Sequence, residues 1–232
     1  MLIERGNGMS RRCALVRLGQ LAYDDGLILQ QSAWNRVAAG DWDGILLLLE
    51  HRPVITLGRT YEETELLQTP EMYREQGIEL VNCNRGGKTT CHNPGQLVGY
   101  PILNLSKWQQ DSHWYLRTLE QVVINTVQAF GLSGGRREGY TGAWTGERKI
   151  AAIGVNIRRW ITSHGFALNV NNDLRIFSQI VPCGIREFPV TSMAQEGLTE
   201  VTVDDAAAVL AAEFAKVFAC SLIPADDGIC HI

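Results

Sequence analysis

The chain has 232 residues, of which 45% are hydrophobic and 20% charged, and its formal net charge is −4. This balance is typical of a folded globular protein, and the length suffices for a sizeable core. The slightly negative charge argues against a nucleic-acid-binding protein, because such proteins carry a field of basic residues.

The longest apolar runs, at 45–49 and 206–212, are far shorter than the roughly 20 residues that a membrane helix needs. The first 18 residues lack the apolar segment of a secretory signal, so a cytoplasmic protein is expected. Residues 1–9 are expected to be a disordered extension of a single domain, 1–232. The six cysteines are scattered and form no C-x-x-C pair, so neither a disulfide framework nor a zinc site is expected.

In the first half of the chain, short apolar runs bounded by Gly, Pro or Asn predict strands at 13–18, 44–50, 53–58, 78–83 and 96–103. Between the first two strands, the segment 23–39 has helical periodicity. We expect its inward face to carry Leu27, Ile28, Trp34 and Val37, although Gly26 weakens the pattern.

The second half of the chain predicts two further helices. One covers 112–130, with Ser112 as its N-cap and Gly131 just beyond its end. The other covers 204–220, with Thr202 as its cap. Between them, 149–171 reads as two antiparallel strands. Strands and helices that mix without strict βαβ alternation predict an α/β (α+β) fold, a mixed β-sheet flanked by helices.

The stretch "RGGKTTCHNPGQLVGYPI", 85–102, combines four glycines with Arg85, Lys88 and His92. Glycines let backbone N–H groups approach a ligand, so this segment is a candidate binding loop. It matches neither the Walker A nor the dinucleotide-binding motif. Considered alone, it could equally be a surface turn with solvated basic residues.

A second candidate is Cys183 in "VPCGI", 181–185. Pro182 fixes its own φ and Gly184 permits close approach, so the two would hold the cysteine in one pose. The alternative is an inert core thiol. Lys149 precedes the small residues of "AAIG" at a strand end, where a lysine is more often solvated. If it faces Cys183, its ammonium favours the thiolate, and the pair could perform nucleophilic acyl transfer.

His164 lies in "TSHGFALNVN" and reads either as part of this site or as a hydrogen-bonded structural histidine. Gly165, Phe166 and Ala167 follow it and, with Ile153, could line an apolar slot. Such a slot suits an alkyl chain, since each buried methylene contributes about 0.8 kcal/mol.

Three blocks, "RGGKTTCHNPGQLVGYPILNL", "KIAAIGVNIRRWITSHGFALNVN" and "PCGI", resemble in order and spacing the signature of the lipoyl(octanoyl) transferases. The resemblance implies a fold similar to the catalytic domain of biotin and lipoate protein ligases. It also implies transfer of an octanoyl group from octanoyl-acyl carrier protein to a cysteine and then to a lysine of a lipoyl domain. The implied acceptors are lipoyl domains of 2-oxoacid dehydrogenase E2 subunits and the glycine cleavage H protein. The implied enzyme is a monomer and needs no cofactor or metal.

By the same resemblance, Cys183 is the acyl-thioester nucleophile and Lys149 the lysine that stabilises its thiolate. A backbone N–H near Cys183 is expected to receive the oxyanion. Cys91 and Asn93 replace an aromatic residue and a glycine of the common pattern, which leaves the shape of the pocket open. The implied substrate-binding residues are Arg85, Gly86, Gly87, Lys88, Thr89, Thr90, Cys91, His92, Ala152, Ile153, Gly154, Gly165, Phe166 and Ala167.

Two other functions compete with this one. The first is an ATP-dependent lipoate or biotin protein ligase, which would not need Cys183. The second is a non-catalytic module that binds acyl carrier protein or a lipoyl domain. Because both partners are acidic proteins, we consider Arg136, Arg137, Arg158 and Arg159 as docking charges, with plain solvated surface as the alternative.

Overall fold

The computed structural model describes residues 11–185 and 187–230, so the extension expected at residues 1–9 lies outside the described residues. Eight strands form one large sheet in the order β11-β1-β2-β6-β10-β9-β8-β7. β1 pairs in parallel with β2 and β11, and the remaining pairs are antiparallel, which confirms the mixed sheet. The bounds are β1 Arg11–Leu21, β2 Gly44–His51, β6 Gln96–Leu103, β7 Gly134–Arg137, β8 Tyr140–Thr145, β9 Arg148–Arg158, β10 Ile161–Asn169 and β11 Cys220–Ala225.

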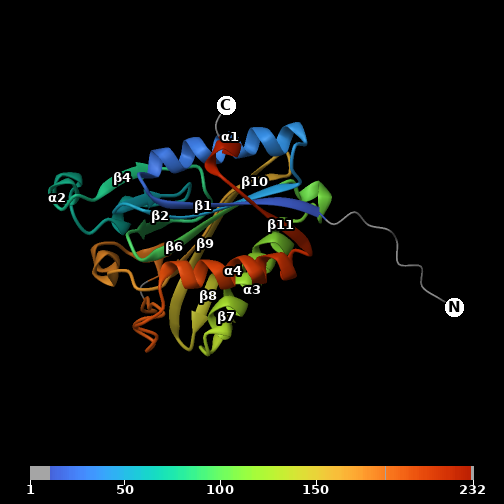
Figure 1. Ribbon diagram of the computed structural model, residues 1–232. Helices are drawn as coiled ribbons and strands as arrows, with labels where there is room; N and C mark the ends of the chain where they lie inside the picture. Colours follow the sequence, from blue (N-terminus) through green and yellow to red (C-terminus); the bar gives the residue numbers. More distant parts are fainter. Residues whose placement is uncertain (1–10, 186, 231–232) are drawn as a thin grey trace.

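Helices cover both faces of this sheet (Figure 1). α1 (Tyr23–Ala39) lies on one face, and α3 (Ser112–Ala129) and α4 (Val203–Val217) pack together on the other. The interior strand β2 is buried on both sides: Ile45, Leu47 and Leu49 join the α1 core, whereas Leu46 and Leu48 join the α3–α4 core. The two-residue period of a strand thus explains why its sequence is one continuous apolar run.

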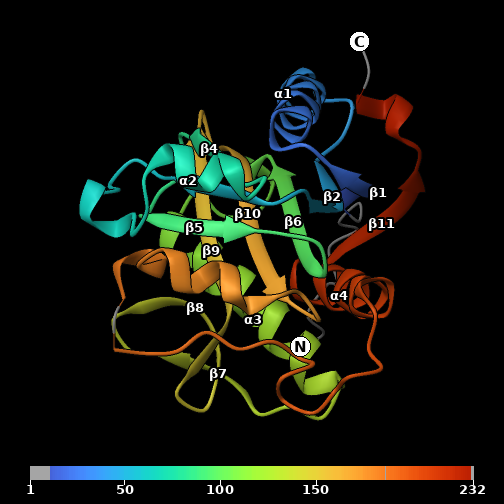
Figure 2. The ribbon, with the colours of Figure 1, turned by 90° about the vertical axis from the view of Figure 1, so that its left-hand side faces the viewer.

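A three-stranded sheet, β4-β3-β5, carries a smaller core of its own. Figure 2 shows β5 beside the orange segment that follows β10, which contains η3 and η4. This neighbourhood brings the glycine-rich stretch next to the cysteine segment. The elements are β3 Val54–Leu57, β4 Glu79–Asn82, β5 Thr89–His92, α2 Pro70–Glu75, and the 3₁₀ turns η1 Glu63–Glu65, η3 Leu174–Gln179 and η4 Pro182–Gly184; η2 Leu105–Lys107 and η5 Asp227–Cys230 lie elsewhere.

The helix predicted at 23–39 is confirmed, but its inward face was assigned only in part. Val37 is buried and Trp34 packs against the core, as predicted. Ile28 is instead 67% exposed, and the buried positions include Leu29 and Ala33. Gly26 also lies on the buried face, where a Cβ would come 2.8 Å from Cε1 of His51. The glycine that weakens the helical pattern is therefore required by packing.

Two helix boundaries differ from the prediction. Asp111, not Ser112, caps α3, because its carboxylate accepts the N–H groups of His113 and Trp114 at 2.8 and 3.1 Å. Thr202 caps α4 as predicted and forms a capping box with Asp205. That helix ends at Val217, since Cys220 already begins β11.

The sequence located some strands and missed others. The strand at 96–103 coincides with β6, but the candidate loop 85–102 also contains β5, and β7, β8 and β11 were not predicted. None of the helices within 11–185 and 187–230 has the length and apolar character needed to cross a membrane.

Candidate active site

Cys183 occupies the middle of the short turn η4 in a left-handed conformation, with φ 55° and ψ 17°. Such a conformation is uncommon for a residue with a side chain. The Gly184 N–H donates to the Val181 carbonyl at 3.1 Å, and the Ile185 N–H donates to the Pro182 carbonyl at 2.9 Å. Both N–H groups already have acceptors within the turn, and the backbone oxyanion donor expected beside Cys183 stays a prediction.

Lys149 faces this cysteine. Its Nζ donates to Cys183 Sγ at 3.3 Å, although the two residues are 34 positions apart in the chain. The lysine is only 7% exposed. Its backbone exchanges hydrogen bonds with the segment after the cysteine, since its N–H reaches the Pro189 carbonyl and its carbonyl accepts the Thr191 N–H, both at 2.9 Å. The fold therefore brings together the two residues that the sequence singled out.

Gly142, on the neighbouring strand β8, makes room for the lysine. The pairing of β8 with β9 shifts register between Ala143 and Trp144, and Gly142 itself has φ 135°. A Cβ on Gly142 would come 2.8 Å from Lys149 Cε. Glycine is thus required here both by the backbone conformation and by the side chain that crosses it.

Lys149 and Cys183 open onto a cavity of about 680 Å³. Small residues paired across β9 and β10, Ala152 with Ala167 and Gly154 with Gly165, keep one wall open. Twelve of the predicted binding residues line the cavity: Arg85, Gly86, Gly87, Lys88, Thr90, His92, Ala152, Ile153, Gly154, Gly165, Phe166 and Ala167.

Thr89 and Cys91, the other two predicted binding residues, do not line it. β5 alternates its side chains, so Thr90 and His92 face the cavity while Cys91 packs into the core of the small sheet. Burial raises the pKa of the Cys91 thiol well above its ordinary value, which keeps that thiol neutral. Cys91 is therefore no competing nucleophile.

The cavity is lined by four cationic side chains and, among the described residues, by no carboxylate. Arg85 is 7% exposed, and its guanidinium donates to Thr56 Oγ1, to the Thr56 carbonyl and to the Gly86 carbonyl. All these acceptors are neutral, and no described carboxylate forms an ion pair with Arg85. Arg59, which the sequence analysis did not single out, joins Arg85, Lys88 and Lys149 in this lining.

Glu65 connects the binding loop to the cysteine turn. Its Oε1 lies 2.8 Å from Lys88 Nζ, its Oε2 accepts the Thr89 N–H at 2.9 Å, and its carbonyl accepts the Val181 N–H at 2.8 Å. Burial opposes ionisation of Glu65, but the bonds from Lys88 and Thr89 outweigh it and lower its pKa. A charged Glu65 thus holds η1, β5 and the cysteine turn together.

Three buried histidines lie in or behind the cavity. Burial, aided for His164 by the nearby Arg85, lowers the pKa to about 4 for His51, about 3 for His92 and about 4 for His164. His164 Nε2 is 2.6 Å from Asn84 Oδ1, and its backbone N–H donates to Gln30. His164 is therefore a hydrogen-bonded histidine that also lines the cavity, so the two readings of the sequence do not exclude each other.

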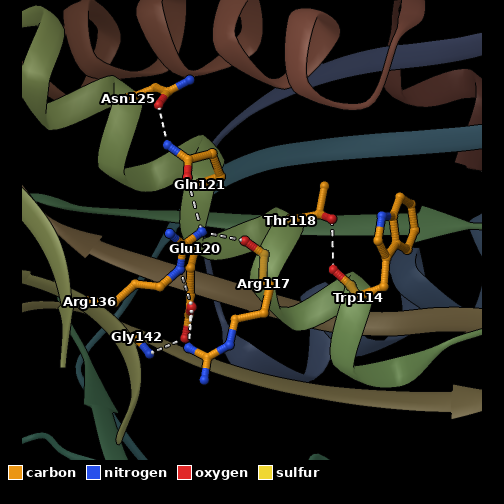
Figure 3. A network of polar contacts seen from close by, with 8 residues as sticks. All are labelled: Trp114, Arg117, Thr118, Glu120, Gln121, Asn125, Arg136 and Gly142. Atoms are coloured by element: carbon orange, nitrogen blue, oxygen red, sulfur yellow. Dashed lines mark hydrogen bonds and ion pairs between the residues drawn. The ribbon is translucent and has the colours of Figure 1, made fainter. Parts of the chain in front are cut away.

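Three of the four arginines considered as docking charges contact other groups of the chain. Arg136 donates to Glu120, to Gln121 and to the Arg117 carbonyl (Figure 3), so it is part of a structural network. Arg137 pairs with Glu147 and lies 3.6 Å from the centre of the Phe188 ring.

Arg158 lies 4.1 Å from the centre of the Trp34 ring, and Arg159 occupies a turn at φ 54°.

Within the described residues, no group of three or more His, Cys, Asp or Glu side chains could hold a metal ion.

Residues 22–215 match the family model of the lipoyl protein ligase A/B catalytic domain, and the chain belongs to this family. Solved structures show the same fold. A T. acidophilum protein with bound lipoic acid superposes with a TM-score of 0.77 at 19% identity, covering 96% of this chain and 93% of that one. Lipoate-protein ligase A bound with ATP gives 0.73, also at 19% identity, and covers 96% and 93%.

Curated relatives with higher sequence identity assign the chain to a narrower group within this family. Proteins named octanoyltransferase from Clostridium kluyveri and Solibacter usitatus are 45% and 46% identical to it, each over 92% of this chain and over 91% and 96% of their own lengths. A Gloeobacter violaceus octanoyltransferase is 47% identical over 89% of this chain and 90% of its own. Within the ligase-like fold, the chain is thus a member of the octanoyltransferases, which are acyltransferases. The family resemblance seen in the sequence is confirmed.

Proposed function

We propose that this enzyme moves an octanoyl group from octanoyl-acyl carrier protein to Cys183, and from there to a lysine Nε of a lipoyl domain. The observation that carries the proposal is the 3.3 Å contact between Lys149 Nζ and Cys183 Sγ at a cavity with paired small residues on one wall. Relatives that share 45% or more of the sequence bear the name octanoyltransferase.

The proposed first step is thioester exchange. The Cys183 thiolate attacks the carbonyl carbon of the donor thioester, a new carbon–sulfur bond forms, and the carbon–sulfur bond to the carrier breaks. The carrier leaves as a thiolate, which takes a proton from the Lys149 ammonium. One thioester replaces another, so the acyl group stays activated without ATP.

The second step transfers the acyl group to nitrogen. The acceptor amine attacks the Cys183 thioester, and neutral Lys149 accepts the proton that the nitrogen loses. Cys183 leaves as a thiolate, and the regenerated ammonium of Lys149 again lies beside it. One lysine thus supplies and retrieves the proton in successive steps.

The charge of the cavity supports a donor with an anionic arm. Arg85 is buried among neutral acceptors, and a buried charge without a counter-charge is costly. The phosphodiester of a carrier's prosthetic arm would supply that counter-charge, with Arg59 and Lys88 lining the same cavity.

The partners and location are finer parts of the same proposal. We infer that the acceptors are lipoyl domains of 2-oxoacid dehydrogenase E2 subunits and the glycine cleavage H protein. A solved archaeal relative is a bipartite lipoate protein ligase described with its E2 lipoyl domain, which supports this choice of acceptor. A cytoplasmic location agrees with the free thiols of Cys13, Cys83, Cys91, Cys183 and Cys220.

Intact-protein mass spectrometry tests the proposal. The enzyme is mixed with octanoyl-acyl carrier protein, and Cys183→Ser is compared with Cys83→Ser, which alters another half-buried free thiol. We expect one octanoyl adduct, labile to hydroxylamine, on the unchanged protein and on Cys83→Ser, but not on Cys183→Ser.

Other results would contradict the proposal. No adduct on the unchanged protein would favour the binding module, and lipoyl-domain modification from free octanoate and ATP that survives Cys183→Ser would favour the ligase.

A further inference from the structure

Glu120 on α3 is a buried carboxylate that lines no part of the cavity. Its side chain is 1% exposed, and its Oε2 accepts hydrogen bonds from Arg117 Nη1 and Arg136 Nε, both at 2.8 Å (Figure 3). Carboxylates are rarely buried this deeply without a partner, and here two guanidinium groups neutralise the charge. Only Glu120 is buried among these three groups, since the side chains of Arg117 and Arg136 are 58% and 37% exposed. The cost of burying this carboxylate calls for an explanation.

The second oxygen of Glu120 reaches the strand β8 at the point where the Lys149 side chain passes it. Its Oε1 accepts the N–H of Gly142 at 3.2 Å (Figure 3). Gly142 is the residue whose missing side chain leaves room for Lys149: a Cβ there would lie 2.8 Å from Lys149 Cε and 3.5 Å from Nζ. A continuous set of contacts therefore runs from Arg136 through Glu120 and Gly142 to the lysine beside Cys183.

We propose that Glu120 is a positioning residue for Lys149. By fixing Gly142 in its irregular conformation, it sets the surface over which the lysine side chain passes and so holds Nζ against Cys183 Sγ. The inference rests on the proposed function, in which Lys149 serves Cys183.

Arg117 and Arg136 neutralise Glu120 and so leave Lys149 free to contact the cysteine. They satisfy the charge of Glu120, and among the described contacts Lys149 forms no ion pair with any carboxylate. The ammonium thus keeps the cysteine sulfur as its partner instead of turning toward Glu120. A carboxylate with a single hydrogen bond and no arginines would instead compete with the sulfur for the lysine.

The test uses Glu120→Gln with Glu213→Gln as its matched control. Glu213, on α4, is also largely buried and also pairs with a cation, Lys216, but it contacts neither Gly142 nor Lys149. In Glu120→Gln the single amide oxygen can accept hydrogen bonds from the arginines or from the Gly142 N–H, but not from both. Arg136→Gln is a second variant that disturbs Glu120 from a partly exposed position, in case Glu120→Gln does not fold.

Two measurements are made on folded protein. The first is the rate at which iodoacetamide alkylates Cys183 at one fixed pH, with the modified residue located by mass spectrometry. The second is kcat and KM for octanoyl transfer. We expect alkylation of Cys183 to slow several-fold in Glu120→Gln, because a displaced ammonium no longer lies against the sulfur. We expect kcat to fall by about 10-fold to 100-fold while KM stays nearly unchanged, since a small misplacement of a catalytic group has effects of this order.

Different results would contradict the positioning role of Glu120 and the proposed acyl transfer through Cys183. Folded Glu120→Gln and Arg136→Gln with the same alkylation rate and kcat as Glu213→Gln would overturn the positioning role of Glu120. The alkylation rate needs no acyl donor, so slower alkylation of these variants in a protein that never forms an acyl-enzyme would contradict the proposed function and leave the positioning role intact.

Discussion

The side chain of Lys88 lies across the backbone of Gly184, the residue that follows the cysteine of the active site. A Cβ on Gly184 would come 2.5 Å from Lys88 Cδ and 3.3 Å from its Nζ. The ion pair between Lys88 and the buried Glu65 holds the lysine in this position. The glycine-rich segment therefore shapes the cysteine turn as well as the cavity.

Substituting Gly184 by alanine should impair acylation of Cys183. Gly184 has φ 69°, so alanine would be strained there by about 1 kcal/mol, and the clash with Lys88 adds to this cost. Gly131→Ala is the control, because Gly131 also has a positive φ, 88°, but open space around it. Both variants should lose thermal stability, and only Gly184→Ala should lose rate in the acyl-enzyme assay. Equal acylation rates would contradict the role given to this contact.

Lys149→Met should slow both formation and discharge of the acyl-enzyme. Methionine fills a similar volume but provides no proton, and loss of general acid–base catalysis typically costs 10²-fold to 10⁴-fold in rate. Single-turnover rates for each step, followed by mass spectrometry, would show this. Lys107→Met is the control, since that lysine is exposed and its ion-pair partner among the described residues is Asp43. A variant at Lys149 with normal rates in both steps would remove this lysine from the mechanism.

Ala152→Leu should shift the enzyme toward shorter acyl chains. Ala152 and its cross-strand partner Ala167 line the cavity, and a larger side chain would take the space of several methylene groups. Each methylene that cannot be buried costs about 0.8 kcal/mol, or roughly fourfold in kcat/KM. Competition between octanoyl and butyryl carrier proteins would measure the change against Ala208→Leu, an exposed position on α4. An unchanged ratio would mean that the acyl chain binds elsewhere.

The buried histidines should make stability depend on pH. His51 has a pKa of about 4 in the folded protein, against about 6.5 in an unfolded chain. As pH falls from about 6.5 toward 4, the unfolded chain takes up a proton that the fold excludes, so the free energy of unfolding should decrease by about 1.4 kcal/mol per pH unit for this residue. Denaturant titrations of His51→Gln should give a shallower slope in that window. The exposed His113→Gln should not, and equal slopes would contradict the assignment.

The sequence predicted those strands and helix caps that depend mainly on residues adjacent in the chain. The run at 96–103 became β6, and Thr202 became the cap of α4, because a short apolar run and a capping side chain can both be recognised from neighbouring residues. Ile28 was placed on the wrong side of α1, since helical spacing alone cannot show which neighbouring stripe meets the sheet. β5 was hidden inside a glycine-rich stretch, because its strand character comes from pairing with β3.

For the site, the sequence by itself determined the reacting groups. Cys183 and Lys149 were chosen from residue types, small neighbours and a family pattern, all of which are written in the chain. Only the tertiary structure decided which groups surround them. Glu65, Arg59, Glu120 and Gly142 reach the site or its wall from other elements, and no local spacing encodes a contact between α3 and the β8–β9 pair. The alternation of β5, fixed by its pairing in the small sheet, likewise turned Thr90 toward the cavity and Cys91 away from it.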